Sequence, residues 1–281
     1  MAIKLIAVDI DGTLVNSQKQ VTAAVRDAVL EAAEAGIEVA LGTGRAMDEC
    51  FDILEALPEL RYAVCCTGAD VYDIREKKHI YSEPIALETV RLVYDRLREV
   101  DCLFEVMSCG TIYVDADRFP RLAEYRYSQR PGFFERSRTQ VCLPELLRDL
   151  DRPIEKLHLL CRDAAAREQA EALLTDLDLL VLHSVARNLE INTPTASKGV
   201  GLMKLAAYLG IAREETMAIG DNTNDLGMLQ SAGYSVAMAN AHPDVFPHVR
   251  YITRSNDEDG VAAAIRHVLA GTVDAMKKEN L

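Results

Sequence analysis

Two carboxylates one residue apart, Asp9 and Asp11, stand near the start of the chain, after an apolar run over residues 3–8 that only Lys4 interrupts. A short apolar run that ends at a turn, here at Gly12, is typical of a buried strand in a parallel sheet. Side chains at positions i and i+2 of a strand lean the same way, and open α/β sheets bind ligands beyond the carboxyl ends of their strands. These carboxylates are therefore expected to share a metal ion, to share a proton, or to lie in a solvated turn.

Three further polar clusters stand where the sequence predicts strand ends or a helix start. They are Thr43-Gly44-Arg45, Lys198, and the set of Asp221, Asn224 and Asp225. Each cluster alone is compatible with an ordinary turn, a solvated lysine or a helix cap. Because the carboxyl ends of parallel strands face one way, the four clusters together are expected to meet in one crevice.

The residue types in these clusters favour a particular chemistry. Carboxylate and carbonyl oxygens are the ligands that Mg²⁺ prefers. A lysine, a threonine hydroxyl and glycine-flanked backbone amides suit phosphoryl oxygens. Thiols and imidazoles do not gather in the sequence as a zinc site requires. We therefore expect a Mg²⁺ site beside a phosphate-binding site.

An alternation of helices and apolar strands is expected to position the clusters. Residues 22–35 predict a helix, 37–41 a strand, 46–56 a second helix and 62–66 another strand. Turn residues follow each strand, which is typical of a doubly wound parallel sheet. The expected fold class is α/β, with a Rossmann-like parallel core and an inserted α+β cap domain.

The middle third of the chain breaks this alternation. After a hairpin at 71–81, helices are predicted at 87–99, 118–129 and 163–175, and strands at 102–107, 111–114, 155–161 and 179–185. The α/β pattern resumes at Leu189–Ile191 and continues with helices at 198–209, 225–230 and 260–269 and strands at 216–219, 235–238 and 249–253. We expect a core domain of residues 1–83 and 188–281, interrupted by a cap domain of residues 84–187.

The least regular part of the predicted cap is residues 125–138. It contains Tyr125, Tyr127, Phe133 and Phe134, and four arginines, Arg126, Arg130, Arg136 and Arg138. A solvated connector and a substrate-facing lid are both compatible with this composition.

Composition restricts the partners. The 281 residues carry a formal net charge of −13, from 31 basic and 44 acidic side chains. Nucleic acid and anionic membranes are not expected to bind, because either needs a basic face. No apolar run approaches the roughly 18–20 residues of a membrane span. The seven cysteines include no C-x-x-C pair and residues 1–10 lack the features of a secretory signal, so we expect reduced thiols and a cytoplasmic location.

The four clusters, in this order, resemble the four motifs of the haloacid dehalogenase (HAD) superfamily of phosphohydrolases. The residues are Asp9-Ile10-Asp11-Gly12-Thr13, Thr43-Gly44-Arg45, Lys198 and Gly220-Asp221-x-x-Asn224-Asp225. The insert between the second and third motifs resembles the Cof-type (IIB) branch, whose members are mostly sugar-phosphate phosphatases. The segments Val236–Ala241 and Asp259–Val261 are similar to the same branch. Thr67 departs from it, because Asn is expected before Gly68.

The resemblance implies a division of labour between the first two carboxylates. Asp9 would be the nucleophile that forms an aspartyl-phosphate, and the Asp11 side chain would protonate the leaving alkoxide and then activate water. Mg²⁺ would be held by the carboxylates of Asp9 and Asp221 and by the backbone carbonyl of Asp11. Arg45 would either reach the substrate or form a salt bridge with the following helix.

The same resemblance assigns the remaining motif residues to the phosphoryl group. The Thr43 hydroxyl, the Gly44 amide and the Lys198 ammonium would bind its oxygens. Asn224 would contact the phosphate or the substrate, and Asp225 would orient Lys198 or the waters on the metal. The implied enzyme is a Mg²⁺-dependent phosphatase of small phosphorylated metabolites, most of all sugar phosphates.

Two other functions remain open at this point. A phosphomutase that acts on sugar phosphates would carry the same four motifs, and so would a protein that binds a phosphorylated ligand without catalysis. The expected partner in every case is a small phosphorylated metabolite, and the expected assembly is a monomer or a weak homodimer.

Overall fold

A computed structural model describes residues 2–125, 132–183 and 185–276. The chain divides into two compact units. The core unit comprises Met1–Arg45, Cys50–Tyr81 and Ser197–Leu281, and the insert unit comprises Ala46–Glu49 and Ser82–Ala196.

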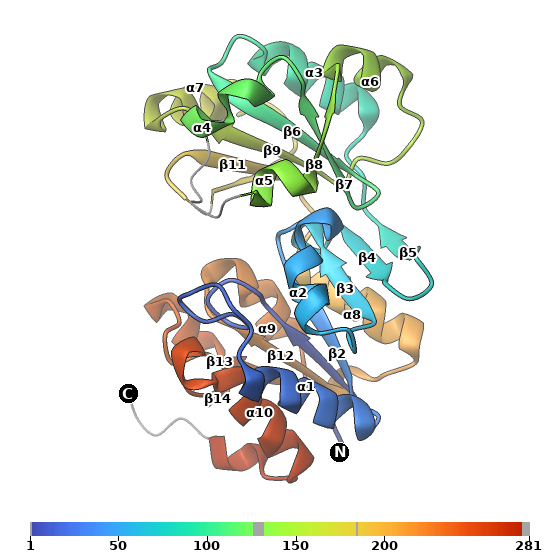
Figure 1. Cartoon of the computed structure of the whole chain (residues 1–281), viewed down its shortest axis with the longest axis vertical. Helices are drawn as coiled ribbons and strands as arrows, with labels where there is room; N and C mark the ends of the chain where they lie inside the picture. Colours follow the sequence, from blue (N-terminus) through green and yellow to red (C-terminus); the bar gives the residue numbers. More distant parts are fainter. Residues whose placement is uncertain (1, 126–131, 184, 277–281) are drawn as a thin grey trace. The chain divides into compact units, whose positions relative to one another are not determined.

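An eight-stranded sheet forms the centre of the core unit, in the order β14-β13-β12-β1-β2-β3-β4-β5 (Figure 1). Its strands are β1 (Leu5–Val8), β2 (Glu38–Gly42), β3 (Tyr62–Cys65), β4 (Asp70–Asp73), β5 (Lys78–Ser82), β12 (Thr216–Gly220), β13 (Tyr234–Ala237) and β14 (Tyr251–Ile252). Neighbours from β14 to β3 are parallel, and β4 pairs antiparallel with β3. The predicted doubly wound parallel core is confirmed.

Short helices connect these strands. The α-helices are α1 (Ala23–Glu34), α2 (Phe51–Ala56), α8 (Lys198–Leu209), α9 (Leu226–Ser231) and α10 (Gly260–Leu269). The 3-10 turns are η2 (Cys66–Gly68), η4 (Arg213–Glu215), η5 (Thr223–Asp225), η6 (Pro243–His248), η7 (Asn256–Glu258) and η8 (Val273–Met276). No described helix is both long enough and apolar enough to span a bilayer.

Both faces of the central sheet are covered, which fixes where a ligand has access. Leu5 and Ala7 of β1 pack in one apolar cluster with Leu202 of α8 and Met228 of α9. Residues that alternate with them along β1 point to the opposite face and are equally buried. Figure 1 shows α1 and α10 beside each other on the same unit. With both faces closed, the carboxyl ends of the strands are the accessible edge.

The insert unit has its own six-stranded sheet, in the order β10-β11-β9-β6-β7-β8. Its strands are β6 (Cys102–Ser108), β7 (Thr111–Asp115), β8 (Arg138–Val141), β9 (Lys156–Cys161), β10 (Leu180–Leu182) and β11 (Asn188–Asn192). Its helices are η1 (Met47–Glu49), α3 (Leu87–Leu97), η3 (Phe119–Arg121), α4 (Leu122–Tyr125), α5 (Phe133–Ser137), α6 (Leu143–Asp149) and α7 (Ala164–Ala172). Helices α3, α6 and α7 pack on one face of this sheet.

The structure differs from the sequence-based expectation at the end of the insert. Leu189–Ile191 was expected to resume the core, but β11 pairs antiparallel with β9 and β10. Leu189 and Ile191 belong to the apolar cluster of the insert unit. The core unit therefore resumes at Ser197 rather than at 188.

Two predicted helices are shorter than the sequence suggested. The helix expected at 46–56 is an α-helix only over Phe51–Ala56, and Met47–Glu49 form a separate 3-10 turn within the insert unit. The described part of the helix expected at 118–129 consists of η3 and α4, which ends at Tyr125.

The irregular segment at 125–138 is well packed where it is described. Tyr125, Phe133 and Phe134 are buried, and the Tyr125 hydroxyl donates a hydrogen bond to Asp101 Oδ1 at 2.8 Å. Because these side chains are buried, this part of the segment is not a solvated connector. Arg136 is exposed. The predictions for Arg126, Tyr127 and Arg130 concern residues outside the described part of the chain.

A buried ionic network lies on the insert sheet, on the face away from the main apolar cluster. Glu105 of β6 stands directly opposite His158 of β9, whose Nδ1 lies 2.8 Å from Glu105 Oε2. Arg138 Nε donates to Glu105 Oε1 at 2.8 Å, and Arg138 Nη2 lies 2.8 Å from Glu49 Oε1. Burial alone would raise the pKa of Glu105, but Arg138 and His158 outweigh it and lower this pKa to about 2.

We predict that Glu105→Gln removes a pH-dependent part of the stability of the protein. A carboxylate whose pKa is depressed on folding stabilises the native state above its unfolded pKa, and this contribution is lost as the pH falls through 4.5 towards 2. The variant is expected to lose about 3–5 kcal/mol at neutral pH, because the buried Arg138 guanidinium loses one of its two carboxylate partners and keeps only Glu49. Denaturant unfolding at several pH values should show the difference from wild type shrinking below pH 4.5; a difference that stays constant would contradict the prediction.

Candidate active site

Three strands of the core sheet end side by side, and each is followed by a residue that the sequence predicted for the site. Asp9 follows β1, Thr43 follows β2 and Asp221 follows β12. Val8 is in register with Leu41 of β2 and with Ile219 of β12. The motif residues thus start from one edge of the sheet, where the carboxyl ends of parallel strands meet.

The side chain of Lys198, in the first turn of α8, reaches the carboxyl edge of the sheet. Its Nζ donates hydrogen bonds of 2.6 Å to Asp9 Oδ1 and of 2.6 Å to Asp225 Oδ1, and the side chain is 1 % exposed. The Ser197 side chain caps the helix by accepting a hydrogen bond from Val200 N. A cation at a helix N-terminus opposes the helix dipole, so the two carboxylates are what stabilise the ammonium there.

The loop after β12 is folded around Asp225. Asp225 Oδ2 accepts hydrogen bonds of 3.0 Å from the backbone N–H groups of Asp221 and Asn222. The Thr13 hydroxyl donates to Asp221 Oδ1 at 2.7 Å. Oxygens from Asp9, Asp221 and Asp225 lie within 4.8 Å of one another. The loop therefore presents the Asp221 carboxylate beside Asp9, while Asp225 is occupied by Lys198 and the backbone.

Two glycines permit the close approaches that build this edge. Gly12 has a φ of +92°, and a Cβ there would lie 2.4 Å from Asp221 Oδ2. Gly68 has a φ of +93°, and a Cβ there would lie 1.9 Å from the carbonyl oxygen of Ser197, next to the start of α8. A side chain at either position would push Asp221 or Lys198 away from Asp9. Thr67, which precedes Gly68, is itself left-handed with a φ of 60°, a conformation that suits Asn better than a β-branched residue.

The charges of the cluster do not balance. Burial raises the pKa of Asp9, and the charges of Asp225 and Asp221 add to this, although Lys198 acts in the opposite direction. Burial also raises the pKa of Asp221 to about 6, against the hydrogen bond from Thr13. Three carboxylates thus surround one ammonium. An oxygen-only donor set with an excess of negative charge fits a hard divalent cation such as Mg²⁺.

The side chain of Asp11 is directed into a different set of contacts. Asp11 Oδ2 accepts hydrogen bonds from Arg45 Nη2 at 2.7 Å and Nε at 3.0 Å, and Oδ1 accepts one from Lys19 Nζ at 3.0 Å. Burial raises the pKa of Asp11, but Arg45 and Lys19 together lower it below its usual value. Arg45 also forms a salt bridge of 3.4 Å with Asp52 of α2. The predicted salt bridge with the following helix therefore exists, alongside the pairing with Asp11.

The remaining predicted residues differ in how they are placed. Thr43 is buried, and its hydroxyl accepts a hydrogen bond of 3.1 Å from the N–H of Arg45, which fixes the turn that also contains Gly44. Asn224 lies exposed on η5, one residue before Asp225. The structure thus places Thr43 and Gly44 at the edge of the sheet and leaves Asn224 facing solvent.

Three residues that contact the motif residues had no role in the sequence-based prediction. Thr13 binds Asp221, Lys19 binds Asp11, and the Asn240 side-chain amide donates to the carbonyl oxygen of Gly12 at 2.8 Å. Thr13 belongs to the first motif, and a hydroxyl so close to two carboxylates in the sequence could have indicated that it takes part in the site. Lys19 lies within an exposed polar turn, which carries no such signal.

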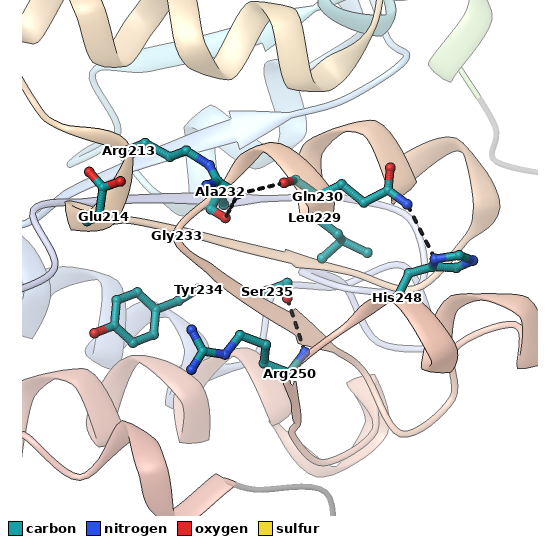
Figure 2. Close-up of a pocket in the computed structure, with 10 residues that line it drawn as sticks. All are labelled: Arg213, Glu214, Leu229, Gln230, Ala232, Gly233, Tyr234, Ser235, His248 and Arg250. Atoms are coloured by element: carbon teal, nitrogen blue, oxygen red, sulfur yellow. Dashed lines mark hydrogen bonds between the residues drawn. The ribbon is translucent and has the colours of Figure 1, made fainter.

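The core unit also contains a hollow of about 620 Å³. Figure 2 shows the residues that line it. It is lined by Arg213, Glu214, Leu229, Gln230, Ala232, Gly233, Tyr234, Ser235, His248 and Arg250. Tyr234 begins β13, so the hollow faces the amino ends of the strands. Arg213 Nε donates to the carbonyl oxygen of Ser231 at 2.7 Å and so caps α9. Because none of the motif residues lines this hollow, it is not the candidate active site.

Similarity to known proteins identifies the family. Residues 6–265 match the haloacid dehalogenase-like hydrolases. Phosphatase YwpJ of Bacillus subtilis is 34 % identical, over 95 % of this chain and 100 % of the relative. The 5-amino-6-(5-phospho-D-ribitylamino)uracil phosphatase YcsE of Bacillus subtilis is 29 % identical, over 94 % of this chain and 95 % of the relative. The crystal structure of a haloacid dehalogenase-like hydrolase from Bacteroides thetaiotaomicron superposes with a TM-score of 0.80 at 28 % identity, covering 95 % of this chain and 99 % of that one.

The chain belongs to the haloacid dehalogenase-like hydrolase family. The resemblance drawn from the four motifs is therefore confirmed, and so is the prediction of a phosphoric monoester hydrolase.

Proposed function

We propose that this protein is a Mg²⁺-dependent phosphatase of small phosphorylated metabolites, most of all sugar phosphates, which acts through an aspartyl-phosphate on Asp9. One observation carries the proposal: Lys198 Nζ bridges Asp9 and Asp225 at 2.6 Å in a buried cluster that also contains Asp221. A buried carboxylate beside a fixed ammonium is suited to attack a phosphate dianion, because the opposite charges reduce the repulsion.

The first step transfers the phosphoryl group to Asp9. An Asp9 carboxylate oxygen forms a bond to phosphorus while the bond between phosphorus and the ester oxygen breaks, and the leaving oxygen takes the electron pair. Water then attacks phosphorus and releases inorganic phosphate and the free carboxylate. Lys198, the Thr43 hydroxyl and the Gly44 amide bind the phosphoryl oxygens in this scheme, and Asn224 contacts the phosphate or the substrate.

Mg²⁺ would be held by the carboxylates of Asp9 and Asp221 and by the backbone carbonyl of Asp11. When bound, it neutralises the charge of the carboxylates and of the phosphoryl oxygens. The Thr13 hydroxyl keeps Asp221 oriented towards Asp9. Asp225, whose two oxygens are already bonded to Lys198 and to the loop backbone, holds the ammonium in position.

Asp11 serves both halves of the reaction through its side chain. In the first half it donates a proton to the leaving alkoxide, and in the second half it accepts a proton from the attacking water. Arg45 and Lys19 favour the ionised form of Asp11, which is the form that accepts the proton.

The substrate class rests on the relatives. YcsE is named for a phosphorylated ribityl compound, and another relative, YbhA of Escherichia coli, is named a pyridoxal phosphate phosphatase. We assign the choice of substrate to the insert unit, Ala46–Glu49 and Ser82–Ala196, which carries none of the four motifs. Phosphate release should be measured with phosphorylated sugars, ribityl compounds and pyridoxal phosphate. Free phosphate supports the proposal, whereas an isomerised sugar phosphate without free phosphate would indicate a phosphomutase.

Removal of divalent metal is expected to abolish turnover. Three clustered carboxylates cannot admit a phosphate dianion without a neutralising cation. Hydrolysis of p-nitrophenyl phosphate should stop with EDTA and return when excess Mg²⁺ is added. Full activity in EDTA, with metal analysis showing a metal-free protein, would contradict the proposed cofactor.

The variant Asp11→Asn should separate proton transfer from metal binding. Only the backbone carbonyl of Asp11 is assigned to Mg²⁺, so the metal affinity should change little. Turnover should fall by about 10²–10⁴-fold for alkyl phosphates and less for p-nitrophenyl phosphate, whose leaving group needs no proton. Calorimetric Mg²⁺ titration and steady-state kinetics test both parts, and a large loss of Mg²⁺ affinity would count against this division of labour.

A further inference from the structure

The loop after the first motif carries a lysine whose ammonium contacts the proposed acid–base residue. Lys19 Nζ donates to Asp11 Oδ1 at 3.0 Å, and Lys19 belongs to none of the four motifs. We propose that Lys19, presented by the loop of residues 16–20, is a positioning residue that holds the Asp11 side chain for proton transfer. This inference rests on the proposed function and adds a residue to it.

The loop is closed by its own hydrogen bonds. Asn16 Oδ1 accepts hydrogen bonds of 3.0 Å from the N–H groups of both Gln18 and Gln20. Asn16 N donates to the carbonyl oxygen of Gln20 at 3.0 Å, and Lys19 N donates to that of Asn16 at 2.8 Å. Four bonds within five residues fix where the Lys19 side chain leaves the backbone.

The contact between Lys19 and Asp11 contributes little to the stability of the fold. The φ of Lys19 is 60°, in the left-handed region that non-glycine residues seldom adopt. The ion pair that results is half-exposed, at 46 % for Lys19 and 45 % for Asp11, and exposed ion pairs contribute little to folding. The main effect of this ion pair is therefore on the orientation of the Asp11 carboxylate, not on the stability of the fold.

The loop is also anchored to a distant part of the core unit. Ser17 donates from its N–H to Asp257 Oδ1 at 2.8 Å and from its hydroxyl to Asp257 Oδ2 at 2.6 Å. The side-chain amide of Asn256 donates to the carbonyl oxygen of Val15 at 3.0 Å. Turn η7 therefore holds the loop in place against the sheet edge.

Lys19 and Arg45 hold the two oxygens of Asp11 separately. Arg45 binds Oδ2 and comes from the end of β2, whereas Lys19 binds Oδ1 and comes from the loop. Arg45 alone would fix one oxygen and leave the carboxyl group free to turn about it. With Lys19 in place, both oxygens have a fixed donor, so the carboxyl group keeps one orientation in the active site.

The first test compares Lys19→Ala, Lys19→Arg and Lys77→Ala in the full-length protein with Mg²⁺. Lys77 is a matched control, because it is an exposed lysine with a φ of 51° in the turn between β4 and β5. We expect Lys19→Ala to lower kcat for alkyl phosphates by about tenfold, with KM within about twofold and a smaller effect on p-nitrophenyl phosphate. Lys19→Arg should recover part of kcat, and Lys77→Ala should match wild type.

The second test asks whether the anchor acts through Lys19. Asp257→Ala should lower kcat for alkyl phosphates as Lys19→Ala does, in addition to any loss of thermal stability. In the double variant the two effects on kcat should not multiply, because the anchor has no lysine left to position. A purely structural loop would instead give independent, multiplying effects.

Four results would overturn the inference. They are wild-type kcat for alkyl phosphates in Lys19→Ala, a raised KM with unchanged kcat, an equal loss in Lys77→Ala, and multiplying effects in the double variant. A raised KM would show that Lys19 binds substrate. An inactive wild-type protein on every phosphate ester would instead refute the proposed function, and so the two failures are distinguishable.

Discussion

Replacement of Asp9 by Asn is expected to abolish both turnover and the phosphoenzyme, with a loss of kcat of at least about 10⁴-fold. The amide is close in size to the carboxylate but is a far weaker nucleophile towards phosphorus. It also removes a negative charge from the cluster, so Lys198 Nζ keeps Asp225 as a partner and the fold should be retained. Phosphate release and mass spectrometry of the acid-quenched enzyme measure the two effects.

A matched control for this variant is Asp27→Asn, an exposed carboxylate on α1 with 61 % of its side chain accessible. It should leave kcat, KM and the phosphoenzyme level unchanged. A phosphoenzyme at wild-type level in Asp9→Asn, or a phosphorylated peptide that lacks Asp9 in the wild-type digest, would contradict the assignment of the nucleophile.

The fold of the core could be predicted because its signals are local. Residues 3–8 and 37–41 are short apolar runs that end in turn residues, and both form parallel strands, β1 and β2. A strand buried on both faces has to be apolar along its length, so the sequence alone identifies it. The positions of the motif residues then follow, because parallel strands end on the same edge.

The boundary of the insert could not be predicted in the same way. β11 is a short strand whose apolar residues suit any sheet, and only its partners, β9 and β10, place it in the insert unit. The burial of Phe133 and Phe134 could not be predicted either, because they lie in an irregular segment that is rich in arginine. Their burial depends on packing with elements that the sequence pattern did not resolve, such as α5 itself.

The candidate site shows the same limit at the level of side chains. The motifs predict which residues gather, but not how their charges are shared. Asp225 is bonded to Lys198 and to two backbone N–H groups, so it supports the site rather than remaining open to a ligand. Asp11 is bonded to two cations from different elements, one of which, Lys19, stands in no motif. These pairings arise only when the loops are folded together.

Replacement of Lys198 by Met has the second of the largest expected effects, because it removes the cation that pairs with both Asp9 and Asp225. In the native protein both buried carboxylates lie 2.6 Å from the Lys198 ammonium. The variant leaves them without this common partner. We expect kcat/KM to fall by at least about 10³-fold, since a donor to the phosphoryl oxygens is lost. Stability should fall by about 3–5 kcal/mol, since uncompensated buried charge remains.

The matched control is Lys204→Met, on the same helix, whose exposed Nζ lies 4.8 Å from the centre of the Tyr81 ring. It should keep wild-type kcat/KM. Adding Asp225→Asn to Lys198→Met removes one of the orphaned carboxylates, so it should restore part of the stability and none of the activity. This pattern would separate the electrostatic support of the fold from the binding of phosphate. Recovery of activity in the double variant would mean that Lys198 acts only by neutralising Asp225, and the role of its ammonium towards phosphate would have to be withdrawn.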